Sequence, residues 1–146
     1  MRVMALDVGS KTIGVAVSDP FGWTAQGLET IFHTTREKDF AQLRKLVDEY
    51  GVEEFVLGKP LNMDGSSGIR VERTMDFAKE LAEAFPQIPQ QFWDERLTTV
   101  IAEKQLIAAD VSRRKRKKVI DKMAAVVILE GYLRHLALQS NTGGKA

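Results

Sequence analysis

Apolar residues at the start of the chain follow the two-residue period of β-strands. Residues 3–6 are all apolar, so both faces of the first predicted strand are apolar until Asp7. A second apolar segment begins at Ile13, after the short polar stretch GSKT, and a third spans 27–33. This pattern predicts an antiparallel hairpin extended by a third strand. A carboxylate at the end of a buried strand is the first position where the pattern is broken.

Further along the chain, apolar residues recur three or four positions apart, as on one face of a helix. A first helix is predicted to end at Gly51, and its apolar positions are Phe40, Leu43, Val47 and Tyr50. A second is predicted to end at Pro86, and its apolar positions are Met75, Ala78, Ala82 and Phe85. The last covers 119–138, and the residues expected on or near its inner face are Met123, Ala124, Val127, Ile128, Gly131 and Leu136.

A short buried strand is predicted at 55–57 and a further strand at 90–93, between these helices. Three leading strands followed by helix, strand, helix, strand and helix indicate an α/β fold with a mixed sheet flanked by helices. The first three strands are expected to be antiparallel and the later ones parallel. We expect one domain over 1–138 and a flexible tail over 139–146. Sites in such sheets usually lie at the carboxyl ends of strands.

Composition narrows the possible chemistry. The 146 residues include no cysteine and two histidines, which excludes disulfides and thiolate zinc sites and argues against a histidine-rich metal site. Any metal is therefore expected to be a hard ion held by oxygen. No leader and no apolar run of membrane-spanning length is found, so the sequence predicts a cytoplasmic protein without a membrane partner.

The charge is unevenly distributed. Residues 1–112 carry 12 Lys and Arg against 18 Asp and Glu, a net −6, whereas residues 113–146 carry nine against two, a net +7. Six of the cations form one uninterrupted block: Arg113, Arg114, Lys115, Arg116, Lys117 and Lys118. Such a block is a candidate contact for a nucleic-acid phosphate backbone. The alternative is a solvated loop without a partner.

Acids interrupt the apolar pattern at three places. Asp7 and the pair Asp94–Glu95 end predicted strands, and Asp121 lies in the first turn of the last helix beside small alanines. Each has an ordinary explanation as a turn residue, a surface ion pair or a helix-dipole partner. Two carboxylates about 4 Å apart repel by about 4 kcal/mol at an effective dielectric of 20, so a convergent cluster needs cations or protons. Two Mg²⁺ or Mn²⁺ ions would satisfy it and would suit phosphodiester hydrolysis.

Four motifs in this order carry a family resemblance: ALDVGSKTIGVAVSD, VLGKPLNMDGS, DERLTT and IDKMAAVVILEGYL. The chain resembles the YqgF/RuvX family of RNase H-like nucleases over nearly its whole length. The resemblance implies a five-stranded RNase H-like sheet and a hydrolase that matures the pre-16S ribosomal RNA, or alternatively a Holliday junction resolvase. It also implies three catalytic, metal-binding acids, which are Asp7, Glu95 and Asp121 here. Asp94 remains an alternative to Glu95, which has the longer reach.

Loop residues at strand ends supply further candidates for phosphate binding, and these are Lys11, Thr12, Lys59, Asn62 and Arg96. The expected partner is structured RNA, possibly ribosome-associated, or branched DNA, bound by a monomer or a homodimer. Two other functions stay open. DVGSKTIG also resembles the phosphate-binding hairpin of actin and hexokinase-like ATP-binding proteins, and the basic block alone would suit a non-catalytic nucleic-acid-binding module.

Overall fold

The computed structural model describes residues 1–59, 68–94 and 113–143, and within the last range it describes side chains from 123 to 139. The described strands form one mixed sheet in the order β3-β2-β1-β5-β6, with β4 also paired to β2. Their bounds are Val3–Val8 for β1, Thr12–Ser18 for β2, Ala25–Gly27 for β3, Ile31–Phe32 for β4, Glu54–Lys59 for β5 and Gln90–Asp94 for β6. β2 runs antiparallel to β1, β3 and β4, whereas β1, β5 and β6 are parallel. The predicted mixed α/β fold is confirmed.

The third strand differs from the prediction, because the segment 27–33 does not form one continuous strand. β3 pairs with the end of β2, where Ala16 lies opposite Gly27, and β4 pairs with its beginning, where Ile13 lies opposite Ile31. Three steps along β2 thus correspond to four along the partner, so the partner contains one extra residue. An extra residue of this kind is a bulge, and it shifts the side-chain alternation that a sequence pattern relies on.

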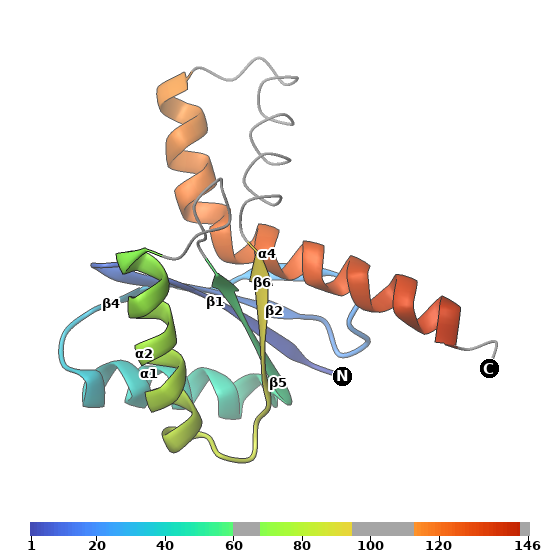
Figure 1. Cartoon of the computed structure of the whole chain (residues 1–146), viewed down its shortest axis with the longest axis horizontal. Helices are drawn as coiled ribbons and strands as arrows, with labels where there is room; N and C mark the ends of the chain where they lie inside the picture. The colour runs from blue at the N-terminus through green and yellow to red at the C-terminus, as the bar shows by residue number, and fades with distance from the viewer. Residues whose placement is uncertain (60–67, 95–112, 144–146) are drawn as a thin grey trace.

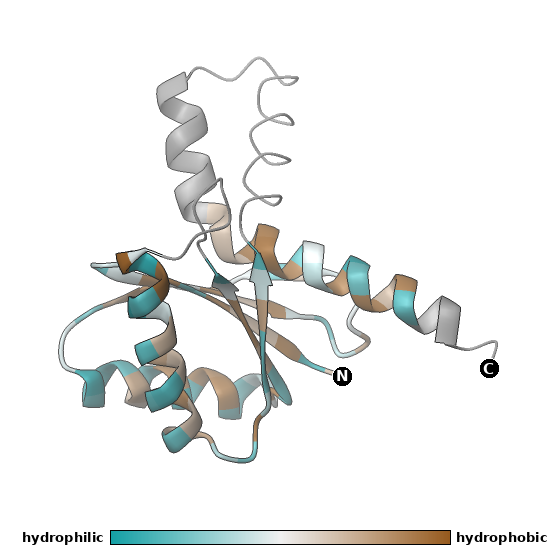
Figure 2. Cartoon of the chain, viewed as in Figure 1, coloured by the Kyte–Doolittle hydropathy of each residue, from teal (hydrophilic) through white to brown (hydrophobic). Residues whose placement is uncertain are grey.

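Helices cover both faces of the sheet (Figure 1). α1 (Arg36–Tyr50) and α2 (Ile69–Ala84) pack on the face that carries Met4 and Leu6, and α4 (Arg113–Gly143) packs on the face that carries Val3 and Ala5. Figure 2 shows the hydrophobic residues of these helices alternating with hydrophilic ones, as expected for one buried side. α1 ends as predicted at Gly51, whose φ of 62° suits a glycine cap.

The predicted inner faces of two helices need correction. Met75 and Ala82 of α2 are exposed, as is Met123 of α4. The buried side of α2 instead consists of Val71, Thr74, Phe77, Ala78 and Leu81. That of α4 consists of Ala125, Ile128, Leu129, Tyr132 and Leu133. Both helices carry apolar residues on more than one side, and the faces with the larger or more numerous side chains pack on the sheet.

α4 is longer than predicted, since it begins at Arg113 and ends at Gly143. The basic block therefore lies inside the helix and not ahead of it, and residues 139–143 of the predicted tail are helical. Figure 1 shows α4 bending, with its first part standing away from the sheet and its second part crossing it. Close packing is possible there because Gly131 has no side chain: a Cβ would lie 2.9 Å from Cζ2 of Trp93. In the part of the chain that the structure describes, no helix is long and apolar enough to cross a membrane.

Candidate active site at the carboxyl ends of the central strands

Asp7 lies near the carboxyl end of β1 on the face that α4 covers. Its partner on β2 is Gly14, and the two-residue alternation places Asp7 on the same face as Val3 and Ala5. A Cβ added to Gly14 would lie 3.5 Å from Cβ of Asp7 and 3.6 Å from Cβ of Ala125 on α4. Asp7 and Ala125 of α4 therefore both border the position that a side chain at Gly14 would occupy. Asp7 is half-buried between the strand edge and α4.

The strand alternation gives the face on which Asp94, the last residue of β6, lies. Trp93 packs against Gly131 of α4, so its side chain is on the same sheet face as Asp7. Asp94 is the next residue of β6 and lies opposite Lys59 of β5. Because neighbouring strand residues point to opposite faces, Asp94 is directed toward the α1 and α2 layer. By this alternation Asp94 and Asp7 lie on opposite faces of the sheet, and Glu95 lies outside the described residues.

The other predicted site residues fall into three groups. Lys11 is exposed in the turn between β1 and β2, and Thr12 begins β2 at the same edge of the sheet. Lys59 ends β5, opposite Asp94 in register. Asp121 and the basic block are helical residues of α4 whose side chains lie outside the description, as do Asn62 and Arg96 altogether. Within the described ranges, no group of three His, Cys, Asp or Glu residues could hold a metal ion.

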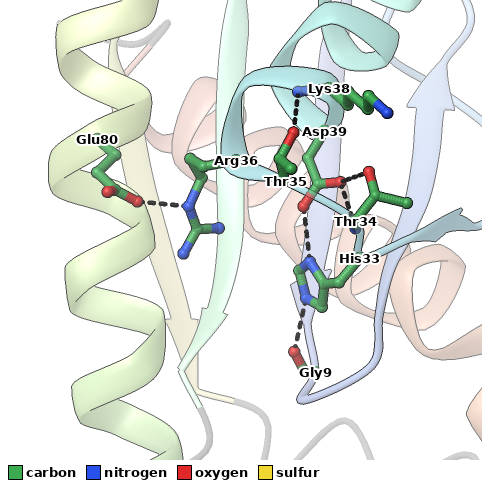
Figure 3. Close-up of polar contacts among 8 residues, drawn as sticks. All are labelled: Gly9, His33, Thr34, Thr35, Arg36, Lys38, Asp39 and Glu80. Atoms are coloured by element: carbon green, nitrogen blue, oxygen red, sulfur yellow. Dashed lines mark hydrogen bonds and ion pairs between the residues drawn. The ribbon is translucent and has the colours of Figure 1, made fainter.

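A partly buried polar cluster beside this edge was missed by the sequence analysis (Figure 3). His33 follows β4, and its ring nitrogens lie 2.9 Å from Oδ2 of Asp39 and 2.9 Å from the carbonyl oxygen of Gly9. Asp39 is 2% exposed in the first turn of α1, and its Oδ1 accepts hydrogen bonds from the Thr34 backbone N–H and hydroxyl. Asp39 lies four residues before the buried Leu43, so a polar residue on an apolar helix face was the available signal.

Asp39 is ionised in this cluster. Burial alone would raise the pKa of its carboxyl group, but the hydrogen bonds from His33 and Thr34 and the charge of His33 together lower the pKa below its ordinary value. A carboxylate with a lowered folded-state pKa stabilises the protein above its unfolded pKa, and the contribution disappears as the pH falls through the folded value.

We therefore expect Asp39→Asn to lower the free energy of unfolding at pH 6 by about 1–3 kcal/mol, the usual cost of weakening buried charged hydrogen bonds. The difference from wild type should shrink steadily as the pH falls below about 4. Urea unfolding of both proteins from pH 6 to pH 2.5 measures this. A difference that stays constant across the range would contradict an ionised Asp39.

Comparison with known proteins adds independent findings. A family model described as "RuvX: Holliday junction resolvase" matches residues 1–135. A protein of Desulforamulus reducens named "Putative pre-16S rRNA nuclease" is 59% identical over 133 residues, covering 91% of this chain and 96% of that protein. A Bacillus subtilis protein of the same name is 56% identical over 138 residues, covering 93% and 99%.

Among solved structures, the chain is similar to Thermus thermophilus RuvC in complex with a Holliday junction substrate, with a TM-score of 0.55 and 13% identity. The match covers 94% of this chain and 96% of RuvC. At this identity the likeness concerns the fold alone, and it agrees with the RNase H-like class of sheet.

Proposed function

The chain belongs to the RuvX family of nucleases, and from this premise we propose that it is a metal-dependent endonuclease that hydrolyses phosphodiester bonds of structured RNA during maturation of the pre-16S ribosomal RNA. The observation that carries the site is the position of Asp7, half-buried at the carboxyl end of a central strand and turned toward α4. An ordinary turn aspartate would have no reason to face a packed helix.

The second acid of the proposed site is Asp121. It stands four residues before Ala125 in α4, and helix positions four apart share one face. Ala125 is the α4 residue that packs over Gly14, beside Asp7. We therefore expect Asp121 about one helical turn, roughly 5.4 Å, beyond Ala125 in the direction of the carboxyl ends of the strands. We assign the third position to Glu95, since Asp94 is directed to the other face.

The chemistry of these donors fits a hard divalent cation. All three are carboxylates, and the chain contains no cysteine that would favour a softer metal. Asp7, Glu95 and Asp121 would hold Mg²⁺ or Mn²⁺, in a pair as the family resemblance suggests. Such ions, when bound, lower the pKa of water and stabilise the leaving oxygen in phosphodiester hydrolysis.

The chain's own residues would hold the substrate against this centre. Lys11 and Thr12 lie in and directly after the turn that follows Asp7, where a cation and a hydroxyl can bind a phosphate oxygen. Asn62 and Arg96 follow β5 and β6 in the sequence and are assigned the same role. Lys59 is directed toward the α1 and α2 layer, which favours a contact with a neighbouring phosphate over one with the reacting group.

One assay tests this function against the alternatives. The purified protein is incubated with labelled structured RNA, single-stranded RNA and four-way DNA junctions in Mg²⁺, Mn²⁺ or a chelator. Metal-dependent cleavage of structured RNA is expected. Preferential cleavage of the junction would favour a resolvase, ATP turnover the actin and hexokinase-like alternative, and binding without cleavage a non-catalytic module. The cytoplasmic location and the oligomeric state stay predictions.

The choice between the two neighbouring acids has a direct test. Glu95→Gln is expected to lower cleavage by about 10²-fold or more, because one carboxylate that would hold the metal ions is lost. Asp94→Asn, the same chemical change one residue earlier, should stay within about threefold of wild type because that side chain faces the other layer. Single-turnover cleavage at saturating Mg²⁺ measures both. The reverse order would reassign the third ligand to Asp94.

A further inference from the structure

His33 contacts both sides of the turn that follows Asp7. Its backbone N–H donates to the carbonyl of Lys11 at 2.9 Å, and its ring Nε2 lies 2.9 Å from the carbonyl of Gly9 (Figure 3). The turn itself is closed by the N–H of Gly9, which donates to the carbonyl of Thr12 at 2.8 Å. The His33 side chain therefore joins β4 to the far side of a hairpin turn whose tip, Ser10 and Lys11, is exposed.

The ring has two acceptors and no donor as its partners. Nδ1 lies 2.9 Å from the carboxylate of Asp39, and Nε2 lies 2.9 Å from a backbone carbonyl, so the ring has a polar partner at each nitrogen. His33 thus links the first turn of α1 to the turn after β1. Asp39 is 2% exposed and holds the ring in one orientation, as a fixed support would.

We propose that His33 is a positioning residue of the nuclease site, which fixes the Gly9–Thr12 turn and through it the places of Asp7 and Lys11. The inference rests on the proposed function. Gly9 is two residues after Asp7, so a shift of the Gly9 carbonyl changes the backbone that carries the acid. Catalysis is sensitive to such shifts, because a misplacement of about 1 Å can cost about 10²-fold in rate.

The role of the side chain can be separated from that of the backbone. Any residue at position 33 keeps the N–H that donates to Lys11, so β4 stays paired with β2. His33→Gln places an amide nitrogen at about the reach of Nε2 and can still donate to Gly9, but it gives up Asp39. His33→Asn places an amide nitrogen near the position of Nδ1 and can still donate to Asp39, but it gives up Gly9.

The two variants are expected to rank in opposite orders in two measurements. His33→Gln leaves the buried Asp39 with fewer donors and should melt at the lower Tm, while His33→Asn stays closer to wild type. In kcat for RNA cleavage, His33→Asn should fall by about 10- to 100-fold with little change in KM, while His33→Gln keeps most of the activity. Amide hydrogen exchange at Ser10 and Lys11 should be faster in His33→Asn.

The control is His135→Asn, the same change at the chain's other histidine, which is exposed on α4 with its ring 5.9 Å from that of Trp93 and tilted by 55°. Its kcat should equal that of wild type. If the His33 variant with the lower Tm also has the lower kcat, His33 is structural only and the inference is wrong. The same holds if both variants are folded and cleave like wild type. A wild-type protein that does not cleave would instead refute the proposed function.

Discussion

Asparagine in place of Asp7 is expected to lower cleavage of structured RNA by about 10²–10³-fold or more, while nucleic-acid binding stays within about twofold of wild type. The change removes one negative charge and keeps the size of the side chain. The substitution would weaken the hold on the metal ions, and loss of one group on which transition-state stabilisation depends costs this much in other enzymes. Binding is dominated by phosphate contacts with cations, which the substitution leaves in place.

The measurement combines single-turnover cleavage with a filter-binding titration in Ca²⁺ or chelator. Asp121→Asn should give a similar loss, and the double variant should lose little more, because residues that act as one unit are not additive. Asp76→Asn provides the matched control, since Asp76 is exposed on α2, on the other side of the sheet. It should cleave and bind like wild type.

Retention of cleavage in Asp7→Asn would contradict the proposed site even if the protein proves to be a nuclease. The catalytic acids would then have to lie elsewhere. A loss of cleavage together with a fall in Tm of many degrees would point instead to a role for Asp7 in folding. Circular dichroism melting of the same samples separates these results.

Much of the fold was predictable because strand and helix periods are strong signals in this chain. The hairpin of β1 and β2, the parallel β5 and β6 and the stop of α1 at Gly51 all follow from local patterns. The same period also bears on the choice between Asp94 and Glu95, which the residue types alone left open. Trp93 packs on α4, so the alternation along β6 removes Asp94 from the Asp7 face.

Features that depend on contacts between distant segments were not predictable. The bulge between Gly27 and Ile31 becomes visible only when the register on β2 is known. The buried side of α2 depended on which of several apolar faces the sheet could accept, and Met75 was assigned to the wrong one. His33 and Asp39 form no recognisable sequence motif. The His33 ring contacts the carbonyl of Gly9, which lies 24 residues earlier in the chain, so the contact is seen only in the fold.

The basic block is expected to supply a large part of the binding energy for RNA. Replacement of all six cations by glutamine should lower affinity at 0.1 M salt by about 10- to 100-fold and reduce the slope of log K against log salt by about two to three. The slope change corresponds to about half of the six, because consecutive helix residues are rotated by about 100° and cannot all face one surface. Lys38, Lys45 and Lys79, exposed cations of α1 and α2, form the matched control, and their replacement should leave the slope unchanged.

Two triple variants show whether the helix presents one face to the substrate. Arg114, Lys115 and Lys118 lie on one side of α4, and Arg113, Arg116 and Lys117 lie on the opposite side. Arg114, Lys117 and Lys118 stand seven, four and three residues before Asp121, so the face of Asp121 borders both triples. Because the helix can turn only one side to the substrate, one triple should carry most of the slope change and the other little. Equal changes would mean that the block acts as an unoriented positive charge, and no change in the six-residue variant would mean that RNA does not contact it.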